Sequence, residues 1–134
     1  MSCMTKIDVL KVETGEELTR NVKPLLHEIR HALAALLDGG ERSTIDLRSM
    51  PLAPGEEQKL LEELGRGEVA AHFNALGPTE IFETRYPGVW VVVHHNNDDE
   101  VIGKFIEVCE IPDLLLSQQD DIRQGLEQLQ AQLA

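Results

Sequence analysis

Apolar residues recur at helical spacing in the segment from residue 21 to residue 39. Leucine and isoleucine side chains follow one another three or four positions apart, and Pro24 falls in the first turn. Asn21 is a residue type that caps helix N-termini, and the pair Gly39-Gly40 stops the pattern. We therefore expect a helix that begins with Asn21 as its cap and ends at the two glycines.

A second, shorter helix is predicted after Pro54. Glu56 and Glu57 suit its positively polarised N-terminal end, and Gly65 is suited to end it in the left-handed conformation. Its apolar stripe consists of three leucines, Leu60, Leu61 and Leu64. Between the two helices, residues 43–47 alternate like a short strand that leads into a loop.

Residues 68–111 predict an antiparallel meander, because β-rich segments alternate there with turn signals. Both pleat faces of residues 89–93 are apolar, so this strand should lie centrally with cover on both sides. The sequence thus predicts an α+β fold, an antiparallel meander of about four to five strands with helices packed against the sheet. The expected strands of the meander are residues 68–75, 79–86, 89–95 and 101–111.

The two ends of the chain carry different signals. Residues 1–20 predict an N-terminal arm, with a short edge strand at residues 6–12 as the alternative, and residues 21–134 predict a single α+β domain. Residues 112–134 predict a helix, broken near Ser117, whose apolar stripe is spaced 4, 3, 4. We favour packing of this stripe on the domain's own sheet, and pairing with a second copy in a homodimer is the alternative. The stripe consists of Ile122, Leu126, Leu129 and Leu133.

Composition excludes several classes of partner. Twelve Lys and Arg against 24 Asp and Glu give the 134-residue chain a formal charge of −12, which disfavours binding to nucleic acid or anionic lipid. No segment approaches the roughly 20 apolar residues of a membrane span. The two cysteines, Cys3 and Cys109, make no disulfide framework, and no signal peptide is recognisable. We expect a cytoplasmic protein.

The sharpest short motif is His27-Glu28-Ile29-Arg30-His31, which matches the H-E-x-x-H pattern of zinc proteases. At 100° per residue, however, both histidines point roughly 150° away from the leucine face, and no third ligand follows in residues 32–40. Two surface histidines are the favoured interpretation. A zinc-dependent hydrolase that uses His27, Glu28 and His31 is the alternative.

Other chemistry-bearing residues point to structural roles. Residues 94–100 collect potential metal ligands but lack the calcium-loop template, so we interpret them as a solvated hairpin tip. Cys109 lies on a predicted strand between Glu107 and Glu110, which favours a small core residue over a reactive thiol. No complete catalytic constellation is present, and we expect no enzymatic activity, no cofactor and no metal.

Longer blocks of sequence resemble a known family. Residues 25–33, 45–57, 64–69, 83–90 and 105–112 follow one another in order over most of residues 23–116. In these blocks the chain is similar to the C-terminal domain of the HupH/HyaF-type hydrogenase expression/formation proteins, whose typical members carry further sequence N-terminal to it.

The resemblance implies an accessory chaperone in the maturation of a [NiFe] hydrogenase. Its partners would be a hydrogenase precursor subunit and other maturation proteins, among them a thioredoxin-like one. Aromatic and arginine side chains anchor many protein interfaces, so Arg48, Arg85, Tyr86 and Trp90 are the candidate protein-binding residues. The alternatives are that Trp90 belongs to the core and that Arg48 pairs with a neighbouring acid. A homodimeric interaction module is the remaining functional alternative.

Overall fold

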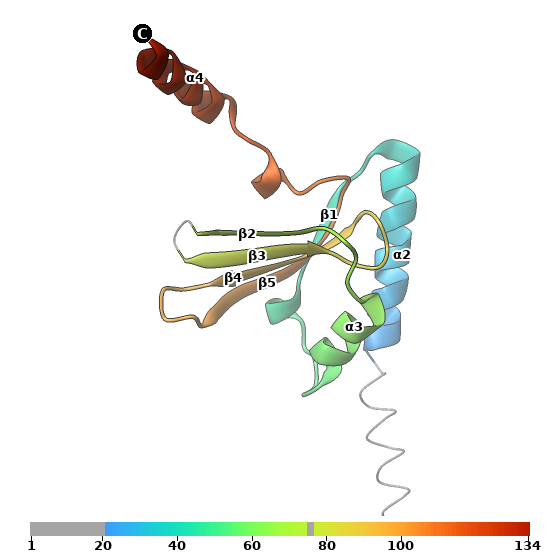
Figure 1. The fold of residues 1–134 in the computed structure, drawn as a ribbon. Coiled ribbons are helices and arrows are strands. Elements are labelled where there is room, and N and C mark those ends of the chain that lie inside the picture. Colours follow the sequence, from blue (N-terminus) through green and yellow to red (C-terminus); the bar gives the residue numbers. More distant parts are fainter. Residues whose placement is uncertain (1–20, 75–76) are drawn as a thin grey trace, which may run out of the picture.

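The computed structural model describes residues 21–74 and 77–134 (Figure 1). The arm predicted for residues 1–20 lies outside these described residues. Helices, strands and short 3-10 turns (η) follow one another in the order α2 (Val22–Gly39), β1 (Ser43–Asp46), η1 (Leu47–Ser49), α3 (Glu56–Leu64), β2 (Ala70–Asn74), β3 (Pro78–Glu83), β4 (Val89–His95), β5 (Val101–Val108), η2 (Asp113–Leu115) and α4 (Gln119–Leu133).

The strands form one antiparallel sheet of five strands in the order β1-β5-β4-β3-β2. Strands β2 to β5 are a meander, and β1 adds to its β5 edge. The predicted α+β fold is therefore confirmed. β4 lies in the middle of the sheet with residues 89–93 buried, as the apolar character of both its faces indicated.

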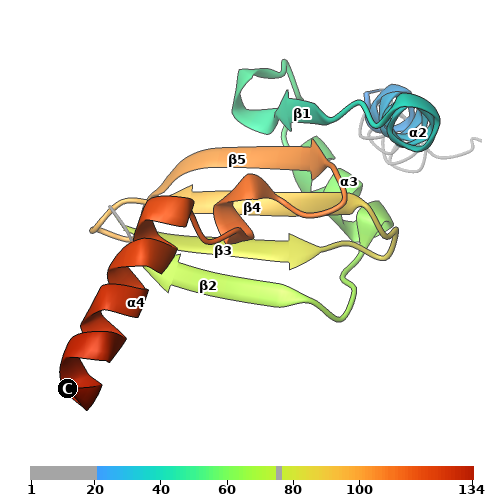
Figure 2. The ribbon, with the colours of Figure 1, turned by 90° about the horizontal axis from the view of Figure 1, so that it is seen from above.

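Helices α2 and α3 lie on one face of the sheet, and the main core is between them and that face (Figures 1 and 2). Leu25 and Ile29 of α2 meet Leu60 and Leu64 of α3 there, together with Ile106 of β5. The opposite face holds a smaller cluster made by the apolar side chains Phe73, Ile81, Trp90, Val92, Phe105 and Cys109, against which Leu115 of η2 packs. The two faces thus differ in cover, with helices on one and a short turn on the other.

Several local expectations need correction. Leu47 begins the 3-10 turn η1 instead of ending β1. Asn21 precedes α2 as predicted, but its side chain makes no capping hydrogen bond and reaches α3 instead. Strand β5 ends at Val108, three residues earlier than expected, so Cys109 lies just beyond it. The side chain of Leu37, counted in the leucine pattern of α2, is 87% exposed.

The C-terminal helix differs most from expectation. The break near Ser117 is present, since residues 116–118 separate η2 from α4. Beyond it, however, α4 stands away from the sheet and has no buried residue (Figure 1). The favoured interpretation, in which the stripe of α4 covers the sheet of its own domain, is therefore wrong. None of the described helices is long and apolar enough to cross a membrane.

Candidate protein-binding surface

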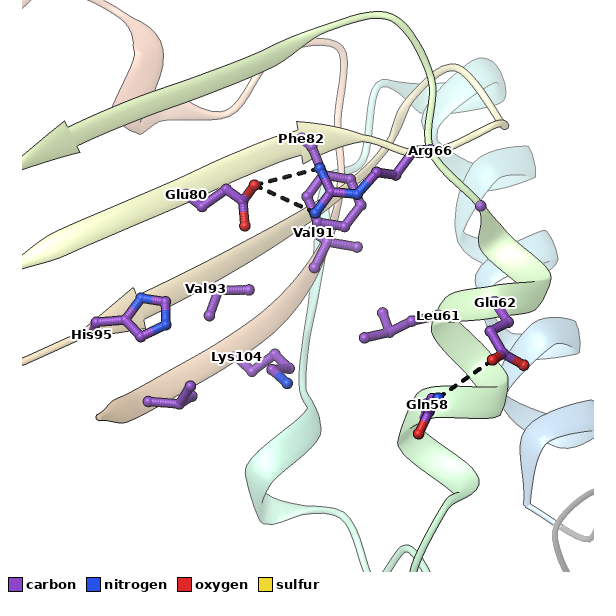
Figure 3. Close-up of a pocket in the computed structure, with 12 residues that line it drawn as sticks. Gln58, Leu61, Glu62, Arg66, Glu80, Phe82, Val91, Val93, His95 and Lys104 are labelled. Atoms are coloured by element: carbon purple, nitrogen blue, oxygen red, sulfur yellow. Dashed lines mark hydrogen bonds and ion pairs between the residues drawn. The ribbon is translucent and has the colours of Figure 1, made fainter. Parts of the chain in front are cut away.

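A groove of about 620 Å³ lies on the α3 side of the sheet, beside the main core (Figure 3). Its position follows from the length of α3, which ends at Leu64 and leaves part of this sheet face without helical cover. The floor is apolar and comes from three elements of the chain, with Leu61 of α3, Phe82 of β3, and Val91 and Val93 of β4. Phe82, Val91 and Val93 are at most 9% exposed, so an apolar side chain of a ligand would contact mainly Leu61 and the rims of the groove.

One rim of the groove carries a fixed arginine. The guanidinium carbon of Arg66 lies 3.8 Å from the centroid of the Phe82 ring, and Arg66 Nη2 is 3.3 Å from a carboxylate oxygen of Glu80. The ring face attracts the cation, and the carboxylate orients it. The side chain of Arg66 is still 57% exposed, so it can contact a partner from this position.

The opposite rim carries a second ion pair. Lys104 of β5 lies 2.5 Å from a carboxylate oxygen of Glu57 in the first turn of α3. Both side chains are at least half shielded from solvent, so this pair fixes α3 against the sheet edge of the groove. The groove therefore has an apolar floor between two oriented pairs of opposite charge.

Two of the predicted binding residues adjoin this groove. Arg48 of η1 donates from Nη1 to the backbone carbonyl of Val101, which lines the groove. The guanidinium therefore pairs with a carbonyl, while the neighbouring acid Asp46 accepts from the backbone N–H of Arg48 at 3.0 Å. Arg85 packs on another lining residue, since a Cβ at Gly65 would lie 2.9 Å from its guanidinium.

Tyr86 follows Arg85 on the turn between β3 and β4, and it is 45% exposed. The guanidinium carbon of Arg85 lies 6.0 Å from the centroid of its ring. This aromatic and cationic pair continues the surface of the groove beyond Gly65. The sequence named the pair as candidates, but it did not predict the groove floor, for which the available signals were Leu61 in the stripe of α3 and the double-sided apolar pattern of residues 89–93.

Trp90 is separated from the other three residues. It lies in the cluster on the opposite face of the sheet, is 5% exposed, and donates from Nε1 to the carbonyl of Cys109 at 3.2 Å. These contacts are those of a core residue, which was the alternative for Trp90. Its ring is not presented to a partner in this structure.

The H-E-x-x-H histidines are exposed on the outer side of α2. The Nη2 atom of Arg30 lies between them, 3.3 Å from Nδ1 of His27 and 3.2 Å from Nε2 of His31. A guanidinium can only donate, so both ring nitrogens act as acceptors towards it. The Arg30 guanidinium thus bridges the two imidazole rings. Among residues 21–74 and 77–134, no group of three or more His, Cys, Asp or Glu side chains is arranged to hold a metal ion.

Cys109 lies near the junction of β5 and η2, where it is 2% exposed. Burial raises the pKa of its thiol, and the neighbouring Arg42 only partly opposes this effect. Arg42 itself is held by Asp113 at 2.8 Å and by the carbonyl of Ile111 at 2.7 Å. The thiol is therefore a protonated core group, as the sequence indicated.

The hairpin tip after β4 is built from its own hydrogen bonds. Asn96 Oδ1 accepts from the backbone N–H groups of Asp98 and Glu100, both at 2.9 Å. Residues 97–100 are exposed. The prediction of a solvated turn is confirmed.

Comparison with protein-family models matches residues 19–134 to the model described as HupH hydrogenase expression protein, C-terminal conserved region. Among curated proteins, the hydrogenase expression/formation protein HoxQ of Azotobacter vinelandii is 32% identical over 114 residues, which cover 81% of this chain and 39% of that protein. The hydrogenase expression/formation protein HupH of Rhizobium leguminosarum bv. viciae is 31% identical over 103 residues, covering 77% of this chain and 36% of that protein. The chain thus spans under two fifths of the length of these relatives.

A solved structure has the same fold. The hydrogenase expression protein HupH from Thiobacillus denitrificans is 41% identical and superposes with a TM-score of 0.81. The match covers 84% of this chain and 94% of that one. The resemblance inferred from the sequence blocks is therefore confirmed.

Proposed function

The chain belongs to the HupH hydrogenase expression protein family through its C-terminal conserved region, and from this we propose that it is an accessory chaperone in hydrogenase maturation. In this proposal it binds a precursor subunit of a [NiFe] hydrogenase, together with other maturation proteins, and catalyses no reaction. Membership of the family supports a role in hydrogenase maturation. That the bound partner is a precursor subunit is our own additional proposal.

The groove between α3 and the sheet supports binding of a polypeptide. Its volume of about 620 Å³ lies within the range of roughly 300–1,000 Å³ usual for ligand sites. Its apolar floor can accept a side chain that a precursor exposes before it is fully assembled. Arg66 and Lys104 on the rims can hydrogen-bond backbone carbonyls or acidic groups beside that side chain.

We assign Arg48, Arg85 and Tyr86 to the borders of the same binding surface. Arg48 contacts Val101 and Arg85 contacts Gly65, so each joins a different part of the groove. The cytoplasm is the proposed compartment, because Cys109 is buried and makes no disulfide within the described residues, and reducing conditions suit such a thiol.

Co-purification with precursor subunits tests this proposal. The full chain, carrying an affinity tag, is incubated at micromolar concentration with the large-subunit precursor and the small-subunit precursor in separate reactions. We expect retention of one of the two and weaker retention of its mature form. Failure of folded protein to retain either precursor would overturn the proposal.

Arginine variants locate the binding surface. Arg66→Glu places an acid at the rim of the groove, and we expect at least a tenfold loss of precursor binding. Arg30→Glu is the matched control, because Arg30 is also exposed but lies on the outer side of α2. Equal loss in both variants would show a general charge effect and would contradict the groove as the binding site.

A further inference from the structure

Exposed apolar side chains are concentrated at the C-terminal end of the chain. Of the twelve large hydrophobic residues that are exposed in the described parts of the chain, seven lie in residues 111–133. A folded domain seldom leaves so many neighbouring apolar side chains in water unless another surface covers them. These seven are Ile111, Leu114, Leu116, Ile122, Leu126, Leu129 and Leu133.

The last four form a single stripe along α4. Their spacing of 4, 3 and 4 places them on one side of the helix, as in the a and d positions of a heptad. Ile122, Leu126 and Leu129 are 56–57% exposed and Leu133 is 79% exposed. Because α4 stands clear of the sheet, no element within residues 21–74 and 77–134 covers this stripe (Figure 1).

The acidic side chains of α4 lie away from the stripe, so the stripe can contact a partner that is also negatively charged. At 100° per residue, the acids of the helix (Asp120, Asp121 and Glu127) point roughly 110° or more from the centre of the stripe. The positions directly beside it are Gln119, Gly125, Gln130 and Gln132, which are uncharged, and the cationic Arg123. A chain with a formal charge of −12 repels a second copy, so contact between two copies requires a surface without acids.

We propose that two copies of this chain associate through α4, stripe against stripe, around a two-fold axis. A stripe with heptad spacing is complementary to itself, which is the condition for such a symmetric interface. Ile111, Leu114 and Leu116 extend the apolar surface beyond the helix. This interface is independent of the proposed chaperone function, and the groove lies on the other side of the sheet.

The size of the surface sets the expected affinity. A helix of 15 residues is about 22 Å long and offers two heptads of contact. Specific interfaces usually bury about 800 Å² on each partner, and the exposed Ile111, Leu114 and Leu116 add apolar surface to that of this short stripe. We therefore expect a dissociation constant in the micromolar range.

Sedimentation equilibrium of the purified full chain between about 1 and 200 μM tests the proposal without any client. We expect a mass that rises with concentration from the 15.0 kDa of one chain towards twice that value. A mass of 15.0 kDa at all concentrations would overturn the proposal. That result would leave the precursor-binding experiment unaffected.

Two double variants locate the interface. Leu126→Glu with Leu129→Glu places charges within the stripe, and we expect dimerisation to weaken at least a hundredfold. Gln124→Glu with Ala131→Glu adds the same charges on the opposite side of α4, and we expect the dimer to persist. Circular dichroism and thermal unfolding verify that both variants are folded. If the stripe variant with two glutamates does not fold, Leu126→Ala with Leu129→Ala is the milder replacement. A dimer that survives the stripe variants would contradict α4 as the contact.

Discussion

Asn21 and Glu56 join the beginnings of the two helices that cover the sheet. The Glu56 carboxylate accepts hydrogen bonds from the backbone N–H of Asn21 at 3.1 Å and from its side-chain Nδ2 at 2.9 Å. It also accepts from the backbone N–H of Ala53 at 2.6 Å, and its side chain is fully buried. One acidic side chain thus links α2, α3 and the loop before α3.

Removal of this carboxylate should lower the stability of the domain. Because Glu56→Ala leaves three partly buried N–H donors without their acceptor and empties a buried site, we expect the free energy of unfolding to fall by about 3 kcal/mol. Asn21→Ala removes only the bond from Nδ2 and should cost about 1 kcal/mol. Urea unfolding followed by circular dichroism measures both, with the exposed Glu62→Ala on α3 as control. Equal stability of Glu56→Ala and Glu62→Ala would contradict this role.

The single tryptophan provides a second prediction. Trp90→Phe removes the hydrogen bond from Nε1 to the Cys109 carbonyl and leaves a small void, so we expect a loss of about 1–2 kcal/mol. Tyr86→Phe, on the exposed turn nearby, should change stability by less than about 0.5 kcal/mol. Chemical unfolding measures the difference. In the unaltered protein, Trp90 fluorescence should be blue-shifted in the native state and move to the red on unfolding.

Local sequence rules predicted the strands and helix ends well where neighbouring residues determine them. The apolar run 89–93 identified the central strand, and Gly40 ends α2 in the left-handed conformation. Asn21 was recognised as a helix-start residue, but its partner Glu56 is 35 positions away, and residue spacing gives no information on such a contact.

The candidate surface was harder to predict for the same reason. The groove floor combines Leu61, Phe82 and Val91 from three elements, so it exists only after the sheet and α3 have packed. The stripe of α4 was visible in the sequence, whereas its exposure depends on the path of residues 116–118. Periodicity indicates which face of a helix is apolar, and tertiary packing decides what covers it.

The environment of Glu107 indicates that the stability of the folded protein depends on pH. Burial raises the pKa of its carboxyl above the ordinary 4.5, an effect that Arg42 partly opposes. When the pKa of a group is higher in the folded protein than in the unfolded chain, the protonated group stabilises the fold. This contribution is fully present below the pKa of the unfolded chain and is lost as the pH rises through the folded-state pKa. Glu107→Gln should therefore raise the melting temperature at pH 7, and the difference should shrink below pH 4.5.

Differential scanning calorimetry from pH 3.5 to pH 7.5 follows this difference. Glu110→Gln is the control, since it makes the same substitution at a nearby side chain that is exposed. A melting temperature of Glu107→Gln below that of the unaltered protein at pH 7 would show that attraction to Arg42 outweighs burial, contrary to this expectation.

Gly125 offers a gain of stability in α4. A Cβ at this position would meet no atom within 4 Å, and alanine is favoured over glycine inside a helix by about 1 kcal/mol. Gly125→Ala should therefore strengthen α4 and increase its helical signal in circular dichroism. Because a preformed helix loses less entropy on pairing, we also expect dimerisation to tighten severalfold in sedimentation equilibrium. Weaker dimerisation by a more helical Gly125→Ala variant would indicate instead that the bare glycine backbone is itself part of the contact between the two copies.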